Sequence, residues 1–136
     1  MGENFDNKTD RQIIGRLGED AVAARYAEMG FSVVARNLHV ARNEIDLILQ
    51  SEIHLVFVEV KTRNLTSLGT PADAVDYRKQ KKLVLTAMKY LTETESYKQP
   101  RFDVLELWQQ GGRIVRYNLI ENAFSAEDFG GQYEIF

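Results

Sequence analysis

The chain has 136 residues, of which 44% are hydrophobic and 27% are charged, a composition typical of one globular domain with its own core. Its net charge of −3 argues against broad electrostatic adhesion to nucleic acid, and the absence of cysteine excludes disulfides, Cys-ligated zinc and thiol catalysis. There is neither an apolar run approaching the roughly 20 residues that span a bilayer nor the apolar segment of a signal peptide. We therefore expect a cytoplasmic protein with no membrane partner.

The first predicted element is a helix over residues 11–29, which follows a polar and loosely held arm over residues 1–9. We expect Thr9 or Asp10 to cap the start of this helix and Gly30 to end it. The helix also contains two glycines, which are poor helix formers and indicate the close approach of another backbone: Gly15 and Gly18.

The remaining predicted elements follow from apolar patterns bounded by turn residues. In chain order they are three strands, a long helix and two strands, over residues 31–36, 43–49, 53–61, 70–97, 101–109 and 113–119. Residues 50–52 are short enough for a hairpin turn, and residues 70–73 carry the cap residue, proline and acid of a helix start. This order predicts one α/β domain over residues 10–136, with a mixed central sheet flanked by helices.

Two charged triplets lie at the ends of neighbouring predicted strands, Glu-Ile-Asp at residues 44–46 and Glu-Val-Lys at residues 59–61. Residues 55–58 form an unbroken apolar run, so we expect the second strand to be covered on both faces. Charged groups at the edge of such a core are costly unless paired, and hard oxygen ligands suit Mg²⁺ or Mn²⁺. The alternative is a structural role, in which Glu59 and Lys61 pair with surface neighbours.

The positions of two further carboxylates depend on how the predicted elements pair. A hairpin in register about Ser51 would place Asp46 opposite residue 56, so an offset or a bulge is needed to bring Asp46 beside Glu59. Glu19 lies at the border of the apolar stripe of the first helix. It is either a solvated flanking glutamate or a third carboxylate that leans toward the metal.

Basic residues gather between residues 54 and 82, a segment that holds six of them and three acids. Arg63 lies just after the second charged triplet, and Trp108 could stack on bases or pack against the core. A phosphate backbone would explain four further cations near the start of the long helix, which otherwise form a solvated turn: Arg78, Lys79, Lys81 and Lys82.

Five short motifs occur in an order that resembles the YraN family of small bacterial proteins. They lie at residues 15–19, 35–37, 44–48, 57–63 and 101–104, and the Phe-Val-Glu-Val-Lys-Thr-Arg block at 57–63 is the most specific. The resemblance covers the chain from about Ile14 to Leu119, and it departs from the family at Asn43, where glycine is common. It implies a restriction-endonuclease-like fold, similar to that of archaeal Holliday-junction resolvases.

The resemblance also implies the site residues. The catalytic set would be Glu19, Asp46, Glu59 and Lys61, with Lys61 positioning the attacking water and Glu19 completing the site. Magnesium or manganese would be bound by Asp46, Glu59 and the carbonyl group of Val60.

Sequence and resemblance together predict a Mg²⁺- or Mn²⁺-dependent endonuclease that hydrolyses phosphodiester bonds in DNA, including branched or structured DNA. A homodimer would supply the two sites that two cuts on a duplex need. The alternatives are a non-catalytic module of the same fold that binds nucleic acid or a protein, and a purely structural subunit. Lys79 and Gln80 match a polar pair of the family, and the nucleic-acid contacts are expected at Arg63, Arg78, Lys79, Gln80 and Lys82.

Overall fold

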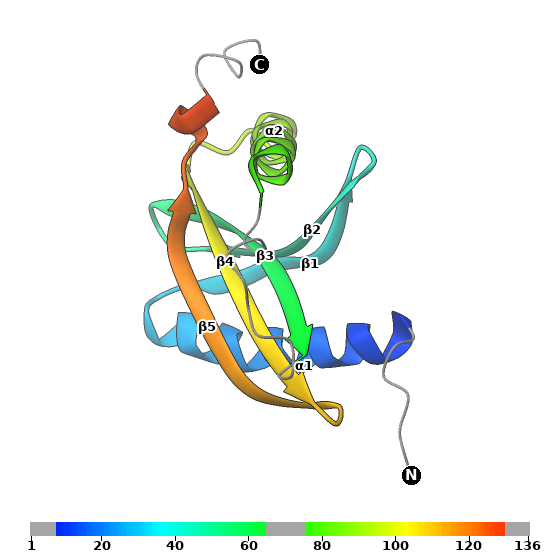
Figure 1. The fold of residues 1–136 in the computed structure, drawn as a ribbon. Coiled ribbons are helices and arrows are strands. Elements are labelled where there is room, and N and C mark those ends of the chain that lie inside the picture. Colours follow the sequence, from blue (N-terminus) through cyan, green and yellow to red (C-terminus); the bar gives the residue numbers. More distant parts are fainter. Residues whose placement is uncertain (1–7, 65–75, 130–136) are drawn as a thin grey trace.

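The structure of the protein is a computed structural model that describes residues 8–64 and 76–129. Figure 1 shows one twisted sheet with α1 packed across one face and α2 on the other. The helices are α1 (Lys8–Glu28), α2 (Tyr77–Glu93) and the short 3₁₀ helix η2 (Ala126–Phe129). The strands are β1 (Ser32–Val40), β2 (Asn43–Gln50), β3 (His54–Asn64), β4 (Gln99–Gln110) and β5 (Arg113–Phe124).

The five strands lie in the sheet in chain order, β1-β2-β3-β4-β5. The first three form an antiparallel meander, β3 and β4 are parallel, and β4 and β5 are antiparallel. A parallel neighbour requires a crossover, and the segment containing α2 provides it between β3 and β4. The predicted α/β fold class, with a mixed sheet flanked by helices and with the expected order of elements, is confirmed.

Each helix covers its face of the sheet with a separate hydrophobic cluster. The cluster under α1 contains Val22, Tyr26, Leu47, Leu49, Val56, Val58, Leu105 and Leu107. The cluster under α2 includes Leu83, Val84, Ala87, Leu91, Ile48, Leu55, Phe57 and Phe102. Successive residues of β3 alternate between the two clusters, so the unbroken apolar run is buried on both faces, as predicted. Each fully buried side chain of this size contributes about 1.5–3 kcal/mol to the free energy of unfolding.

Close packing of α1 on the sheet depends on Gly18. A Cβ atom at this position would lie 2.7 Å from Leu107 Cδ2 and 3.1 Å from Ile114 Cδ1, too close for a side chain without movement of its neighbours. Gly18 thus permits a close approach, but to the side chains of Leu107 and Ile114 and not to another backbone as predicted. Gly15 lies in the part of α1 whose side chains are outside the description. The missing side chain allows the helix axis to lie near β4 and β5.

A buried network of hydrogen bonds joins α1 to β4 at Asp103, which is fully buried. One carboxylate oxygen accepts from Arg101 Nε at 3.0 Å and from the Asn122 N–H at 2.8 Å. The other accepts from Tyr26 Oη at 2.5 Å and from Arg101 Nη2 at 2.8 Å. Burial and the Asp103 carboxylate raise the pKa of Tyr26, so its hydroxyl remains a donor at neutral pH. The Arg-Phe-Asp-Val motif at 101–104 thus has a structural role.

The predicted element boundaries differ from the structure in several places. Because α1 begins at Lys8, Thr9 and Asp10 lie inside the helix, and the prediction that one of them caps it is wrong. Gly30 has a φ of +89°, the left-handed conformation expected after a helix end. The predicted start of the second helix at residues 70–73 lies outside the described residues, as does most of the predicted N-terminal arm.

Candidate active site between β2, β3 and α2

An offset in the β2–β3 hairpin brings the two predicted acids together. The paired residues are Leu47 with Val58 through Gln50 with Leu55, and the next position along this register joins Asp46 to Glu59. The turn between β2 and β3 extends through residue 53, so the pairing of the two strands is centred between residues 52 and 53 and not at Ser51. Ser51 Oγ accepts the N–H of His54 at 3.0 Å, and the Ser51 N–H donates to the His54 carbonyl at 2.9 Å. This offset removes the objection that Asp46 would face residue 56.

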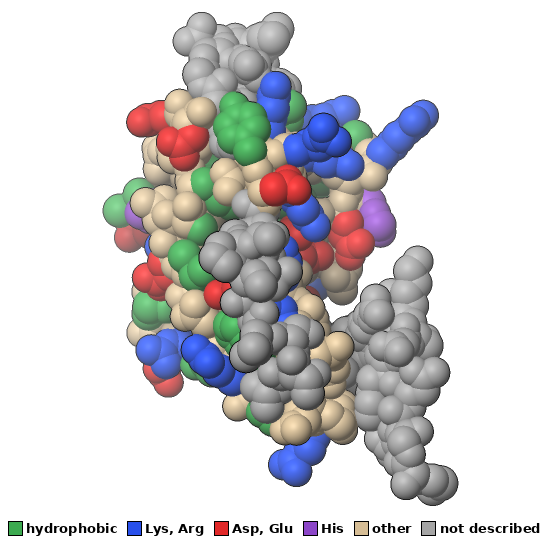
Figure 2. Space-filling model, viewed as in Figure 1, with side chains coloured by type: hydrophobic (Ala, Val, Ile, Leu, Met, Phe, Trp, Pro, Cys, Tyr) green, Lys and Arg blue, Asp and Glu red, His purple; other side chains and the backbone are tan. Residues whose placement is uncertain are grey.

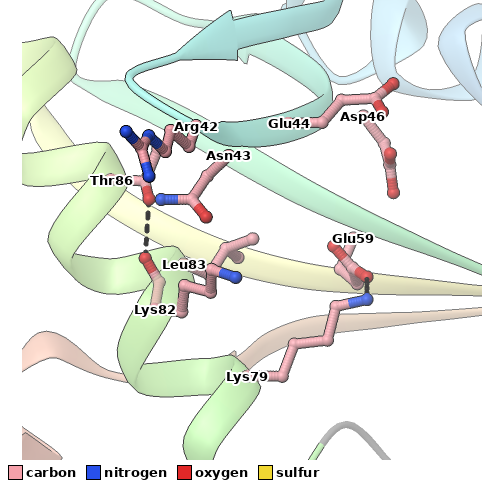
Figure 3. Close-up of a pocket in the computed structure, with 9 residues that line it drawn as sticks. All are labelled: Arg42, Asn43, Glu44, Asp46, Glu59, Lys79, Lys82, Leu83 and Thr86. Atoms are coloured by element: carbon pink, nitrogen blue, oxygen red, sulfur yellow. Dashed lines mark hydrogen bonds and ion pairs between the residues drawn. The ribbon is translucent and has the colours of Figure 1, made fainter.

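Asp46 and Glu59 line a cavity of about 250 Å³ between β2, β3 and α2. In Figure 3, Asp46 and Glu59 extend from adjacent strands toward the same space, and Lys79 reaches Glu59 from α2. The cavity is lined by three cations, three acids and three other residues: Arg42, Lys79, Lys82, Glu44, Asp46, Glu59, Asn43, Leu83 and Thr86.

Lys79 and Glu59 form the closest ion pair in this cavity, with 2.6 Å between Nζ and Oε1. The Glu59 side chain is only 7% exposed, whereas that of Lys79 is 58% exposed. The hydrogen bond to Glu59 raises the pKa of Lys79, so this lysine remains charged. Asp76 fixes the first turn of α2, because its Oδ1 accepts the N–H of Lys79 at 2.8 Å as the N-cap.

Asp46 has the most unusual electrostatic environment of the lining residues. Burial and the neighbouring charge of Glu59 raise its pKa to about 7, although the N–H of Val60 donates to Oδ2 at 2.8 Å and opposes the rise. Glu44 and Glu19 add smaller contributions in the same direction. Near neutral pH the carboxyl group is therefore both a possible proton acceptor and a possible donor.

The sequence interpretation missed four lining residues as members of the site, and it named Glu44 only as part of a charged triplet. The four are Arg42, Asn43, Leu83 and Thr86. Arg42 and Asn43 come from the β1–β2 turn and the start of β2. Thr86 Oγ1 donates to the Lys82 carbonyl at 2.7 Å, one helical turn away. The spacing of residues 79, 82 and 86 places them on one face of a helix, a signal that could have identified Thr86.

Four of the predicted site residues lie outside the cavity lining. Glu19 is buried on α1, with Oε1 3.8 Å from Arg36 Nη1. Lys61 follows Glu59 on the same face of β3, and Arg63 forms an ion pair of 2.8 Å with Glu106. Val60 contacts Asp46 through its N–H.

The two other predicted nucleic-acid contacts lie at the start of α2. Arg78 is exposed and Gln80 is half-buried, and neither side chain lines the cavity. The structure therefore brings together Asp46, Glu59 and two of the predicted cations, Lys79 and Lys82. The remaining predicted residues do not line the cavity, although the Val60 N–H donates to Asp46.

The prediction of Mg²⁺ or Mn²⁺ at this site is wrong. Within residues 8–64 and 76–129, no group of three or more His, Cys, Asp or Glu side chains is arranged to hold a metal ion. The local charges explain the failure, since Lys79 already neutralises Glu59 and the environment of Asp46 favours its uncharged form. Glu59 is thus paired with Lys79, and the raised pKa of Asp46 favours its protonated form.

The fold and the cavity define a small α/β protein with a mixed sheet and an acid–lysine pocket. The chain belongs to the family described as uncharacterised protein family UPF0102, whose model matches residues 18–107, and the resemblance to the YraN family is thereby confirmed. It is 43% identical over 114 residues to UPF0102 protein STH1475 of Symbiobacterium thermophilum, covering 83% of this chain and 97% of that one. It is 35% identical over 120 residues to UPF0102 protein TTE1452 of Caldanaerobacter subterraneus subsp. tengcongensis, covering 86% and 98%.

Among solved structures, the chain is similar to Pyrococcus furiosus SfsA in complex with Ca²⁺. The sequences are 12% identical, the TM-score is 0.39, and the match covers 84% of this chain and 63% of the other. None of the three described helices has the length and apolar character needed to cross a membrane.

Proposed function

We propose that this protein is a nuclease that hydrolyses phosphodiester bonds in DNA, including branched or structured DNA, at the cavity between β2, β3 and α2. The observation that carries the proposal is the placement of the half-buried Asp46 carboxyl in a cavity that Lys79, Lys82 and Arg42 also line. A base or acid and several cations at one concave site are the groups that phosphoryl chemistry needs.

The charge of the cavity fits one phosphodiester. Its three basic residues balance its three acids when Asp46 is ionised, and protonation of Asp46 leaves an excess of one positive charge. A phosphodiester carries a single negative charge, so it completes the balance while Asp46 is protonated, and Asp46 must lose this proton to solvent before it can act as a base. Figure 2 shows blue Lys and Arg side chains gathered over the region of α2, with red carboxylates beside them.

The hydrolytic step uses groups that line the cavity. The Asp46 carboxylate takes one proton from a water molecule while the water oxygen forms a bond to phosphorus. The bond from phosphorus to the leaving sugar oxygen breaks, and that oxygen takes a proton from the ammonium group of Lys82. One strand end then carries the phosphate and the other a hydroxyl, and exchange with solvent restores both side chains. A pKa of about 7 suits Asp46 to this transfer at neutral pH.

The ion pair between Lys79 and Glu59 favours a second candidate, a nucleic-acid-binding module that cuts nothing. In that function the lysines of α2 hold a phosphate, and Asp46 is a half-buried acid without a chemical role. Binding would weaken as salt rises, because each phosphate contact releases counterions.

Strand scission separates the two candidates. Purified protein is incubated with duplex, branched and single-stranded DNA and with RNA, and the products are resolved on denaturing gels. We expect Asp46→Asn to lower the cleavage rate by about 10²–10⁴-fold, the usual loss with a general base. Asp128→Asn, an exposed control in η2, should retain the wild-type rate. Equal rates for wild type and Asp46→Asn would overturn the proposal, and binding without scission by any variant would support the second candidate.

A further inference from the structure

The chain's single tryptophan lies under two arginines from the neighbouring strands. Arg63 of β3 is paired in register with Trp108 of β4, which is paired with Arg116 of β5. The Cζ atoms of Arg63 and Arg116 lie over the indole ring, 5.9 and 4.8 Å from its centroid. The three side chains therefore form one row across the sheet, stabilised by cation–π contacts.

The two arginines of this row differ in their surroundings. The Arg63 side chain is 8% exposed and forms an ion pair of 2.8 Å with Glu106, whose other oxygen accepts from Asn118 Nδ2 at 3.1 Å. Arg116 is exposed, and within the described parts of the chain no carboxylate pairs with it. Arg63 is thus neutralised in place, whereas Arg116 presents its charge to solvent.

This row continues the face of the sheet that carries the candidate active site. Residues 59, 61 and 63 of β3 point to the same face, so Glu59, Lys61 and Arg63 follow one another outward from the cavity. Four residues along β3 and two strand spacings place Arg116 on the order of 15 Å from Glu59. That distance is about the axial rise of four to five base pairs. Lys61 lies between the two ends of this path and is half exposed.

We propose that Arg116, held against Trp108, binds a phosphate of the same DNA molecule whose phosphodiester occupies the cavity, four to five base steps away. The inference rests on the proposed function and adds a second contact to it. Stacking on the indole orients the planar guanidinium before the DNA arrives, so less conformational freedom is lost on binding. Trp108 is a positioning residue here, because both guanidinium groups lie over its ring and leave base stacking to other surfaces.

The single tryptophan makes the contact measurable in the whole protein. Unlabelled duplex of about 12 base pairs, long enough to span both sites, is titrated while Trp108 emission is recorded. The affinity and its salt dependence are measured separately by anisotropy with labelled duplex. Arg25→Gln is the matched control, because Arg25 is an exposed arginine next to Tyr117 on the α1 side of the sheet.

We expect DNA to change Trp108 emission in the wild type and in Arg25→Gln, and not in Arg116→Gln. We also expect Arg116→Gln to weaken binding about tenfold and to make the slope of log K against log salt shallower by about 0.9, the loss of one charged phosphate contact. Arg116→Lys should fall between the two, because it keeps the charge without the planar stack.

Three results would overturn the inference. They are an unchanged emission at saturating DNA, an Arg116→Gln affinity and salt slope equal to those of Arg25→Gln, and an absence of DNA binding by the wild type. If cleavage depends on Asp46 but Trp108 emission is unchanged, or Arg116→Gln binds like Arg25→Gln, the proposed nuclease activity stands and only the Arg116 contact is removed. Binding that depends on Arg116, without cleavage of any DNA, would retain the Arg116 contact and remove the proposed nuclease activity.

Discussion

Lys79 Nζ lies 2.6 Å from Glu59 Oε1, so an ion pair joins the first turn of α2 to β3 across the candidate active site. The pair determines how the cavity is charged, because the exposed lysine compensates an acid that is almost completely buried. A phosphate entering the cavity would share Lys79 with Glu59 and leave Asp46 as the group with a mobile proton. The consequences of this arrangement can be measured on stability as well as on activity.

Lys79→Ala should lower the free energy of unfolding at neutral pH by about 1–2 kcal/mol, because Glu59 is left buried without its cation. Lys89→Ala is the matched control on the same helix, since the Lys89–Glu93 pair is exposed and 3.9 Å long, and its loss should cost no more than about 0.5 kcal/mol. Urea unfolding of both variants makes the comparison. Equal losses would show that the Glu59–Lys79 pair contributes no more than a surface pair.

Asp46 should make the protein less stable as the pH rises from about 4 to about 7. The pKa in the folded chain, about 7, lies above the ordinary value of 3.8, so the folded state binds this proton more tightly than the unfolded state does. The stabilisation is complete below the unfolded pKa and is lost as the pH passes the folded pKa. Asp46→Asn should flatten this part of the profile and be more stable than wild type above neutral pH, by on the order of 2–4 kcal/mol.

The test is urea or thermal unfolding of wild type and Asp46→Asn at matched pH values across this range. Parallel pH profiles for the two proteins would contradict the raised pKa of Asp46. The Asp128→Asn variant, altered at an exposed acid, should follow the wild-type profile.

Gly18→Ala should destabilise the protein despite the better helix propensity of alanine, because the new methyl group would collide with Leu107 in the α1 cluster. Overpacking of this kind costs about 1–3 kcal/mol, and the gain in propensity offsets about 1 kcal/mol of it. In a Leu107→Ala background the collision is removed, so the same substitution should become neutral or stabilising. A double-mutant cycle from urea unfolding measures the coupling, and additive effects would contradict the close approach.

The sequence predicted the order of elements because this order follows from local patterns. The apolar run of β3 had to be buried on both faces, as the two hydrophobic clusters show. The register of β2 on β3 did not follow, because Ser51 hydrogen bonds recentre the turn by an amount that no pattern encodes. The extension of β1 to Val40 was also missed, and the register of β1 on β2 shifts between Val33 and Ala35.

The metal was predicted wrongly for a related reason. Carboxylates at neighbouring strand ends fit a divalent cation in the sequence, but the partner of Glu59 is decided by which side chain the crossover helix presents. Asp76 is the N-cap of α2, and this cap fixes the first turn of the helix so that Lys79 faces β3. A sequence read in segments cannot supply that contact, because it joins positions 20 residues apart through the placement of a helix.

The pH dependence of DNA cleavage tests the central claim most directly, namely that Asp46 transfers the proton in the cavity. The account predicts that kcat/KM rises about tenfold per pH unit below about pH 7, levels off above it, and is lost in Asp46→Asn while Asp128→Asn retains the wild-type curve. Cleavage by Asp46→Asn at the wild-type rate, or a wild-type profile without an inflection near neutral pH, would contradict it.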